Sequence, residues 1–97
     1  MVVANELDIS VIIPTCNDGE TLKKIIDVLH NQTPLPQEIV IVDSSTNDEV
    51  KHVIEESECT VPISHHFEKK AYPGKARNIG VSMTNSNWIA FLDSKTV

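Results

Sequence analysis

Aromatic residues are scarce in this sequence, and long apolar runs and a surplus of positive charge are missing from it. Only 4% of the 97 residues are aromatic, so a core has to be aliphatic, and clusters of valine and isoleucine indicate that much of it is sheet. No apolar stretch reaches the roughly 18 residues of a membrane span, and the first eight residues lack a basic start followed by an apolar run. We therefore expect neither a membrane span nor a signal peptide, and a cytoplasmic protein.

Cysteine is scarce as well. Cys16 and Cys59 have neither paired spacing nor a secretory context, so we expect two reduced thiols. The net charge of -6 argues against nucleic acid as a partner, because nucleic-acid binding needs a basic face. The charge is uneven, however: five of the eight basic residues lie from residue 69 onward, where Asp93 is the single acid. That local excess suits a phosphate-bearing ligand, although a solvated basic edge would look the same.

Strand and helix patterns alternate along the whole chain. The expected strands are residues 8–14, 38–42, 60–66 and 88–92. The expected helices carry apolar stripes, which are Leu22, Ile25, Ile26 and Leu29, then Val50, Val53 and Ile54, then Ala76, Ile79, Gly80 and Met83. The order βαβαβαβ with right-handed crossovers predicts an α/β protein with a Rossmann-like, doubly wound, mostly parallel sheet and helices on both faces.

Polar residues follow three of the expected strands. Asp43 and Asp93 each end an apolar run, and Thr15 follows the first strand. In open parallel sheets ligands bind beyond the carboxyl ends of the strands, so these side chains would share one rim. There an acid can hold a metal ion or a sugar hydroxyl, and Thr15 can hydrogen-bond a ligand. The alternative is that they are turn and cap residues, with Asn17 or Asp18 capping the first helix.

Two basic residues begin the third expected helix. Lys75 and Arg77 lie in its first turn, where unpaired backbone N–H groups already favour anions. Gly74 beside them lets a ligand approach closely. Because a basic first turn is electrostatically unfavourable for a helix, we favour a phosphate-binding role over a purely structural one.

The remaining histidines and cysteine predict no metal or nucleophile site. His65 and His66 are adjacent on an expected strand, so they point to opposite faces and cannot chelate one metal. His30 and His52 lie on expected helices without a partner and are predicted to be surface residues. Cys16 has no base nearby in sequence to activate its thiol.

Four segments together resemble a known family. They are ISVIIPTCN (9–17), IVIVDSSTND (39–48), GKARNIG (74–80) and IAFLD (89–93). Their order over nearly the whole chain is similar to the nucleotide-sugar half of family-two GT-A glycosyltransferases. The resemblance implies a GT-A-type fold and a nucleotide-diphosphate sugar donor, usually UDP-linked. It implies that Thr15 and Asp43 contact the base, that Arg77 lies near the diphosphate or sugar, and that Asp93 lies at the ribose or the metal.

The sequence departs from the family pattern at two positions. Cys16 stands where an aromatic residue is common, and Lys95 stands where the Asp-x-Asp motif has its second acid. The resemblance implies a divalent metal, Mn²⁺ or Mg²⁺, at Asp93, but a protonated lysine cannot ligate a cation and repels it. We expect Lys95 instead to join Lys75 and Arg77 in a cationic pocket for the diphosphate. The alternative is that Lys95, so close to Val97, points to solvent.

The resemblance predicts a glycosyltransferase, with residues 1–97 as a single donor-binding domain and a truncated piece of a longer chain. No general base for an acceptor is recognisable after Asp93, so we expect this chain alone to be inactive. Uncovered apolar edges favour a homodimer. A non-catalytic nucleotide-binding or self-association module with a degenerate metal site remains an alternative. A phospho-receiver ranks last, because no paired acids follow the first strand.

Overall fold

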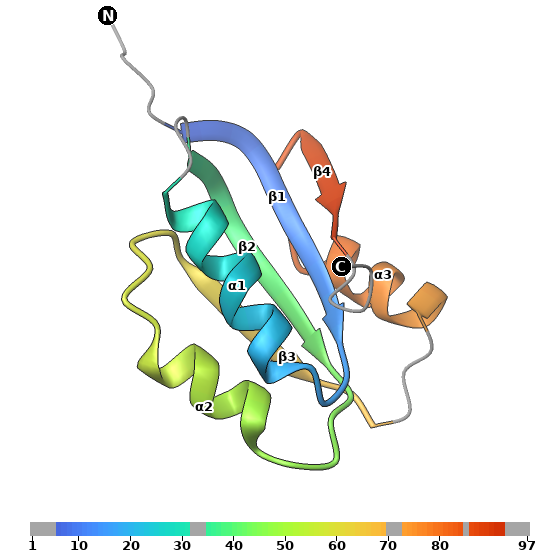
Figure 1. Cartoon of the computed structure of the whole chain (residues 1–97). Helices are drawn as coiled ribbons and strands as arrows, with labels where there is room; N and C mark the ends of the chain where they lie inside the picture. Colours follow the sequence, from blue (N-terminus) through green and yellow to red (C-terminus); the bar gives the residue numbers. More distant parts are fainter. Residues whose placement is uncertain (1–5, 32–34, 70–72, 85, 93–97) are drawn as a thin grey trace, which may run out of the picture.

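The structure, a computed structural model, describes residues 6–31, 35–69, 73–84 and 86–92. Its elements in chain order are β1 (Glu6–Thr15), α1 (Gly19–His30), β2 (Leu35–Asp43), α2 (Glu49–Glu56), β3 (Ile63–Phe67), α3 (Pro73–Ser82) and β4 (Trp88–Phe91). The four strands form one sheet in the order β3-β2-β1-β4, and every neighbouring pair is parallel (Figure 1). The α/β order predicted from the sequence is confirmed.

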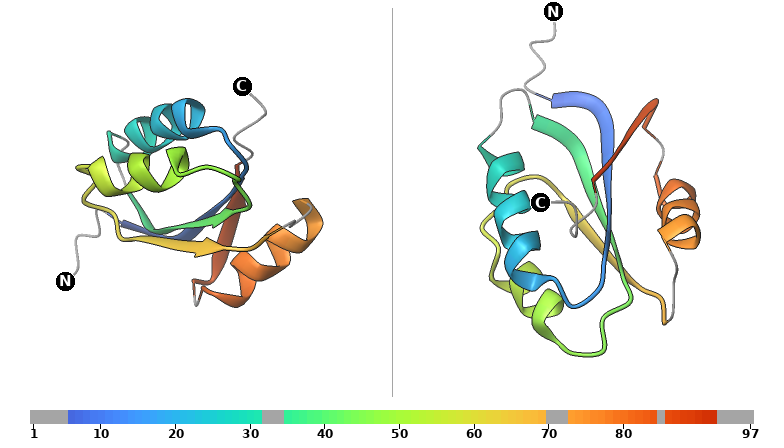
Figure 2. Two further views of the ribbon diagram at one scale, coloured as in Figure 1. Left: turned by 90° about the horizontal axis from the view of Figure 1, so that it is seen from below. Right: turned by 45° about the vertical axis from the view of Figure 1, so that its right-hand side comes forward.

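The helices divide between the two faces of the sheet. Figure 2 shows α1 and α2 together on one face and α3 on the other. Strands β1, β2 and β3 are added in one direction across the sheet, whereas β4 lies on the other side of β1. Because the direction of strand addition reverses after β3, the connecting helix α3 lies on the opposite face. The sheet is therefore doubly wound, as predicted.

The third strand is shorter than the sequence predicted. It begins at Ile63 rather than at residue 60. Pro62 has no N–H for a ladder, but its carbonyl accepts the Ile39 N–H at 2.9 Å and so starts the pairing with β2. Val61, just before it, is still buried in the core.

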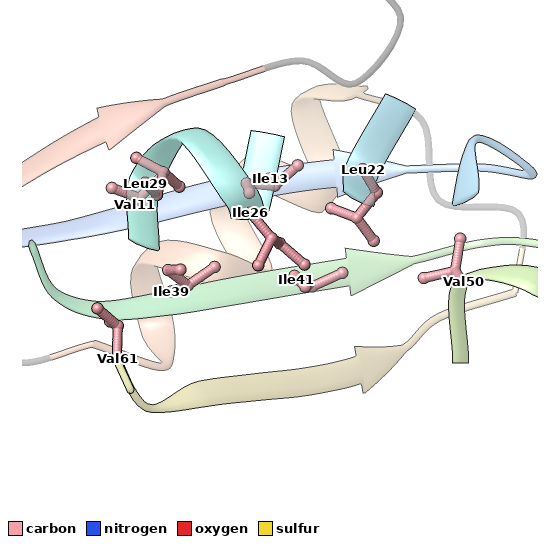
Figure 3. Close-up of a cluster of buried hydrophobic side chains, with 9 residues drawn as sticks. All are labelled: Val11, Ile13, Leu22, Ile26, Leu29, Ile39, Ile41, Val50 and Val61. Carbon is pink, nitrogen blue, oxygen red and sulfur yellow. The ribbon is translucent and has the colours of Figure 1, made fainter. Parts of the chain in front are cut away.

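The face under α1 and α2 carries the larger core. Figure 3 shows its nine buried side chains, which are Val11, Ile13, Leu22, Ile26, Leu29, Ile39, Ile41, Val50 and Val61. Alternate residues of β1 and β2 face the stripe of α1, because successive strand side chains point to opposite faces. Each such aliphatic side chain contributes about 1.5–3 kcal/mol when it is fully buried.

The face under α3 carries a smaller core. Ile12, Val40, Val42 and Ala76 are buried there, and Ile79 and Ile89 pack against them. A Cβ on Gly80 would overlap the Ile12 side chain, so α3 lies directly on β1 because residue 80 has no side chain. Met83 does not extend the stripe as expected. The helix ends at Ser82, and Met83 is 37% exposed in the turn that follows.

A cluster of hydroxyl groups attaches β4 to β1. Ser10 is fully buried, and its Oγ bonds the Thr84 hydroxyl and donates to Ser86 Oγ at 2.6 Å. Ser86 Oγ in turn donates to Gln37 Oε1 at 3.2 Å. These bonds satisfy a buried polar side chain and fix the start of a strand only four residues long. Within the described parts of the chain, no helix is long and apolar enough to cross a membrane.

Candidate functional site

Thr15 and Asp43 lie side by side at the carboxyl edge of the sheet. They are the last residues of β1 and β2 and are paired in the ladder. Both are almost fully buried, with 4% and 3% of their surface exposed. On its other side Asp43 is paired with Phe67, the last residue of β3. The structure thus brings together the two residues expected at the base of a nucleotide.

Both oxygens of the Asp43 carboxyl group have a partner. Oδ1 accepts the Ser45 N–H at 2.8 Å, and Oδ2 lies 2.8 Å from His65 Nε2. An ionised carboxylate can only accept, so His65 Nε2 carries the proton of that bond. The Ser45 bond agrees with the alternative in which Asp43 caps its own loop. It also leaves the carboxylate in one fixed orientation.

His65 is the site residue that the sequence analysis missed. Its ladder partner is Ile41, two residues before Asp43, so both side chains lie on the face of α1 and α2. His66 is paired with Val42 and faces α3 instead. The two histidines do point to opposite faces. Only the register of β3 against β2 identifies His65 as the neighbour of Asp43, and a single sequence does not contain that register.

The two loops beside Asp43 are joined to each other. The Ser44 N–H donates to the Thr15 carbonyl at 2.9 Å, and the Asn17 N–H donates to Ser45 Oγ at 2.7 Å. Asn17 Oδ1 accepts the Thr46 N–H at 3.0 Å. Asn17 has a φ of 56°, a left-handed conformation that asparagine adopts more readily than most residues. The loops therefore form one platform around the strand ends.

Some local expectations about this region are wrong. Asn17 bonds across to the second loop instead of capping α1, and Asp18 at the N-cap position makes no side-chain cap bond. Cys16, by contrast, is a free thiol as expected, and it donates to the Ser44 carbonyl at 3.6 Å. His30, expected to lack a partner, accepts the Thr60 N–H at Nδ1, at 3.4 Å.

Lys75 at the start of α3 is paired with an acid. Its Nζ lies 3.4 Å from Glu68 Oε2, and His66 Nε2 lies 3.2 Å from Glu68 Oε1. The hydrogen bond from His66, and then that from Lys75, lower the pKa of Glu68 below its ordinary value of 4.5. Glu68 stands one residue before the basic stretch noted in the sequence, so it offsets part of that positive charge.

Arg77 lies beside β4. Its guanidinium carbon is 5.9 Å from the centre of the Phe91 ring, a cation–π distance. The space around Gly74 is open, since a Cβ built there meets no atom within 4 Å. Asp93 and Lys95 lie outside the described residues. Among the residues that are described, no group of three or more histidine, cysteine, aspartate or glutamate side chains is placed to hold a metal ion.

The candidate site therefore has an acid side and a basic side. Thr15 and Asp43 share the face of α1 and α2, whereas Lys75 and Arg77 project from α3 on the opposite face. The edge of the sheet lies between the two pairs. A hollow of about 260 Å³ lies between α1 and α2, and none of the predicted site residues lines it.

Comparisons with known proteins agree on one family. The model described as Glycosyl transferase family 2 matches residues 10–95. The poly(ribitol-phosphate) beta-N-acetylglucosaminyltransferase TarP of Staphylococcus aureus is 33% identical over 90 residues, which are 89% of this chain and 28% of TarP.

Solved structures show the same fold. A crystal structure of S. aureus TarS 1-349 matches 91% of this chain and 27% of its own, with a TM-score of 0.79 and 25% identity. Glucosyl-3-phosphoglycerate synthase from Mycobacterium tuberculosis, solved with Mn²⁺, UDP and glucosyl-3-phosphoglycerate, matches 89% of this chain and 33% of its own. Its TM-score is 0.66 at 22% identity. The chain thus spans about a third or less of each relative.

Proposed function

The chain belongs to glycosyl transferase family 2, and from that premise we propose that it binds the nucleotide-sugar donor of a glycosyltransferase. The nucleotide would lie across the carboxyl edge of the sheet, with its base on the acid side and its diphosphate on the basic side. The observation that carries this proposal is the Asp43 carboxylate, which is buried, oriented by the Ser45 N–H and placed next to Thr15.

The chemistry of Asp43 favours uracil as the base. A carboxylate only accepts hydrogen bonds, and uracil presents an N–H donor at N3. Cytosine presents an unprotonated acceptor at the same ring position, so it would place a lone pair against the carboxylate. Hydrogen bonds to a charged group are worth about 1.5–3 kcal/mol, which is enough to discriminate between the two bases. We therefore propose a uridine diphosphate sugar as the donor.

The basic side would hold the diphosphate. Lys75 and Arg77 lie in the first turns of α3, where backbone N–H groups and the helix dipole also favour an anion. The Lys75 side chain is 56% exposed, and an exposed ion pair such as its contact with Glu68 contributes about 0–1 kcal/mol. A diphosphate carries more charge than one carboxylate, so it would displace that partner. Gly74 leaves room for its approach.

The residues present do not fit a divalent metal well. Mn²⁺ accompanies UDP in the mycobacterial synthase, where a metal can neutralise diphosphate charge. In this chain Asp93 supplies one carboxylate, and Lys95 supplies an ammonium group in place of a second. We propose that Lys95, with Lys75 and Arg77, provides the positive charge there. The same substitution favours the second candidate function, a nucleotide-binding module without transfer activity.

These residues would bind the donor without transferring its sugar. Among the described residues of the candidate site, the carboxylates of Asp43 and Glu68 both have partners, so neither is free to act as a base toward an acceptor hydroxyl.

Calorimetric titration with UDP, CDP and ADP tests the proposal. We expect UDP to bind more tightly than CDP or ADP, and Asp43→Asn to lose about tenfold or more of the UDP affinity. Asp48→Asn is the matched control, because Asp48 is an exposed acid a few residues along the same loop and makes no side-chain cap bond. Equal UDP affinity in Asp43→Asn and the wild type would show that Asp43 does not read the base.

A further inference from the structure

Asp43 is not open to a ligand in the conformation that the structure shows. Its side chain is only 4% exposed, although it ends a strand at the edge where ligands bind. The backbone N–H of Ser45, in the turn that follows β2, donates a hydrogen bond to Oδ1 of the carboxylate. The other oxygen is taken by the His65 ring, from a different strand.

His65 is the partner that can leave. It lies on β3, the strand at the edge of the sheet, and its side chain is 25% exposed. Rotation about its side-chain bonds would carry the ring outward without disturbing the ladder. The Ser45 N–H is fixed by the backbone of the loop, which Asn17 also holds through Ser45 Oγ. The Oδ2 atom of Asp43 is therefore the acceptor that can become available.

We infer that His65 competes with the base of the donor for Asp43: its Nε2–H occupies Asp43 Oδ2 in place of the N3–H of the base and is displaced when a uridine nucleotide binds. This inference rests on the proposed function. The imidazole N–H and the uracil N–H are both ring donors, so one replaces the other at the same oxygen. The carboxylate then stays satisfied and oriented in both states, which avoids leaving a buried charge unpaired.

Two roles for His65 predict opposite effects on nucleotide affinity: competition with the base for Asp43, and support of the Asp43 carboxylate. If His65 only held the carboxylate in place for the base, its removal would weaken nucleotide binding. If it competes with the base, removal frees Oδ2 and binding tightens, although the folded chain loses a hydrogen bond. A loss of thermal stability together with a gain of affinity is a result that a purely structural residue would not give.

The experiment measures UDP affinity in His65→Ala and His65→Gln by calorimetry, with thermal unfolding of each variant. We expect His65→Ala to unfold at a lower temperature and to bind UDP about two- to tenfold more tightly, the range that a single net hydrogen bond supplies. His65→Gln keeps an N–H donor and should bind nearly as the wild type does. His52→Ala is the matched control: this histidine is exposed on α2 and belongs to neither side of the candidate site, so its loss should leave the affinity unchanged.

Nitrogen NMR of the histidine rings observes the displacement directly. In the free chain the His65 signals should report a protonated Nε2 bonded to a carboxylate. Addition of UDP should move the His65 ring signals away from that pattern. Unchanged His65 signals at saturating UDP would overturn the inference.

The outcomes separate this inference from the proposed function. If Asp43→Asn loses UDP but His65→Ala binds no more tightly than the wild type, the donor site stands and the displacement of His65 is wrong. If neither the wild type nor His65→Ala binds UDP, the proposed function fails and the inference fails with it. Tighter binding by His65→Ala, lost again in the Asp43→Asn background, supports both.

Discussion

The two faces of the sheet carry cores of different size: a deep core under α1 and α2, and a shallow core under α3. Among the described residues, nine buried side chains form the core under α1 and α2, and four form the core under α3. The stretch from α3 to the end of β4 also carries large apolar residues that remain at least a third exposed, which are Val81, Met83, Trp88, Phe91 and Leu92. The acid side of the candidate site is attached to the deep core, and the basic side to the shallow one. The proposed base-binding side thus has the more rigid support, and the proposed phosphate-binding side the more adaptable one.

The largest expected effect compares one isoleucine on each face. Ile26 of α1 is 2% exposed, and Ile79 of α3 is only partly buried. Ile26→Ala should lower the free energy of unfolding by about 3 kcal/mol, because it leaves a cavity that the deep core cannot close. Ile79→Ala should cost about 1 kcal/mol, since solvent already reaches part of that site. Urea denaturation measures both, and equal losses would remove the distinction between the faces.

The next prediction concerns the contact of α3 with β1. Gly80→Ala places a methyl group against Ile12, so α3 has to shift, and we expect a loss of about 1–3 kcal/mol despite the better helix propensity of alanine. Gly74→Ala in the same helix is the control, because nothing lies within 4 Å of the added Cβ. Thermal unfolding of both variants should show destabilisation in Gly80→Ala alone. A stabilised Gly80→Ala would mean that the helix lies farther from the sheet.

A smaller effect is expected from Lys95. Lys95→Asp restores a second carboxylate two residues after Asp93 and removes a positive charge from the proposed phosphate side. We expect UDP binding by the wild type to be independent of Mn²⁺, and binding by the variant to rise about tenfold when Mn²⁺ is added. Calorimetry of both proteins with and without Mn²⁺ decides it. A wild type that requires Mn²⁺ would contradict the proposed role of Lys95.

The smallest expected effect is the change in melting temperature when Glu68 is protonated at acid pH. Its pKa in the folded chain is lowered, chiefly by His66 and then by Lys75, so its ionised form is stabilised by folding. That contribution is present above the ordinary pKa of 4.5 and is lost as the pH falls through the lower folded value. The melting temperature of the wild type should therefore exceed that of Glu68→Gln at neutral pH and converge with it below pH 4.5. If the difference in melting temperature stayed constant across that pH range, ionisation of Glu68 would not be what stabilises the folded chain.

The fold was predictable because its signals are local. Continuous runs of valine and isoleucine give the strands, the stripes such as Leu22 with Ile26 give the helices, and the rule for parallel sheets places Thr15 and Asp43 at one rim. The partners of the site were not predictable. His65 with Asp43, and Glu68 with Lys75, depend on strand register and on side-chain rotamers, which neither propensity nor periodicity encodes. The predicted homodimer, and the roles of Asp93 and Lys95, stay predictions.

The position of β1 in the sheet also sets an order of assembly. Its pairing with β2 needs only the first 43 residues, whereas its pairing with β4 joins Ile9 to Trp88. On a chain made from its amino end, the deep face and the Asp43 platform can form early. At that stage the Ser10 hydroxyl still lacks its hydrogen bonds to Thr84 and Ser86, which come much later in the chain. Because such distant contacts slow folding, we expect closure of the β4 edge to be the late step, with the proposed acceptor for the base in place before the proposed cations for the phosphates.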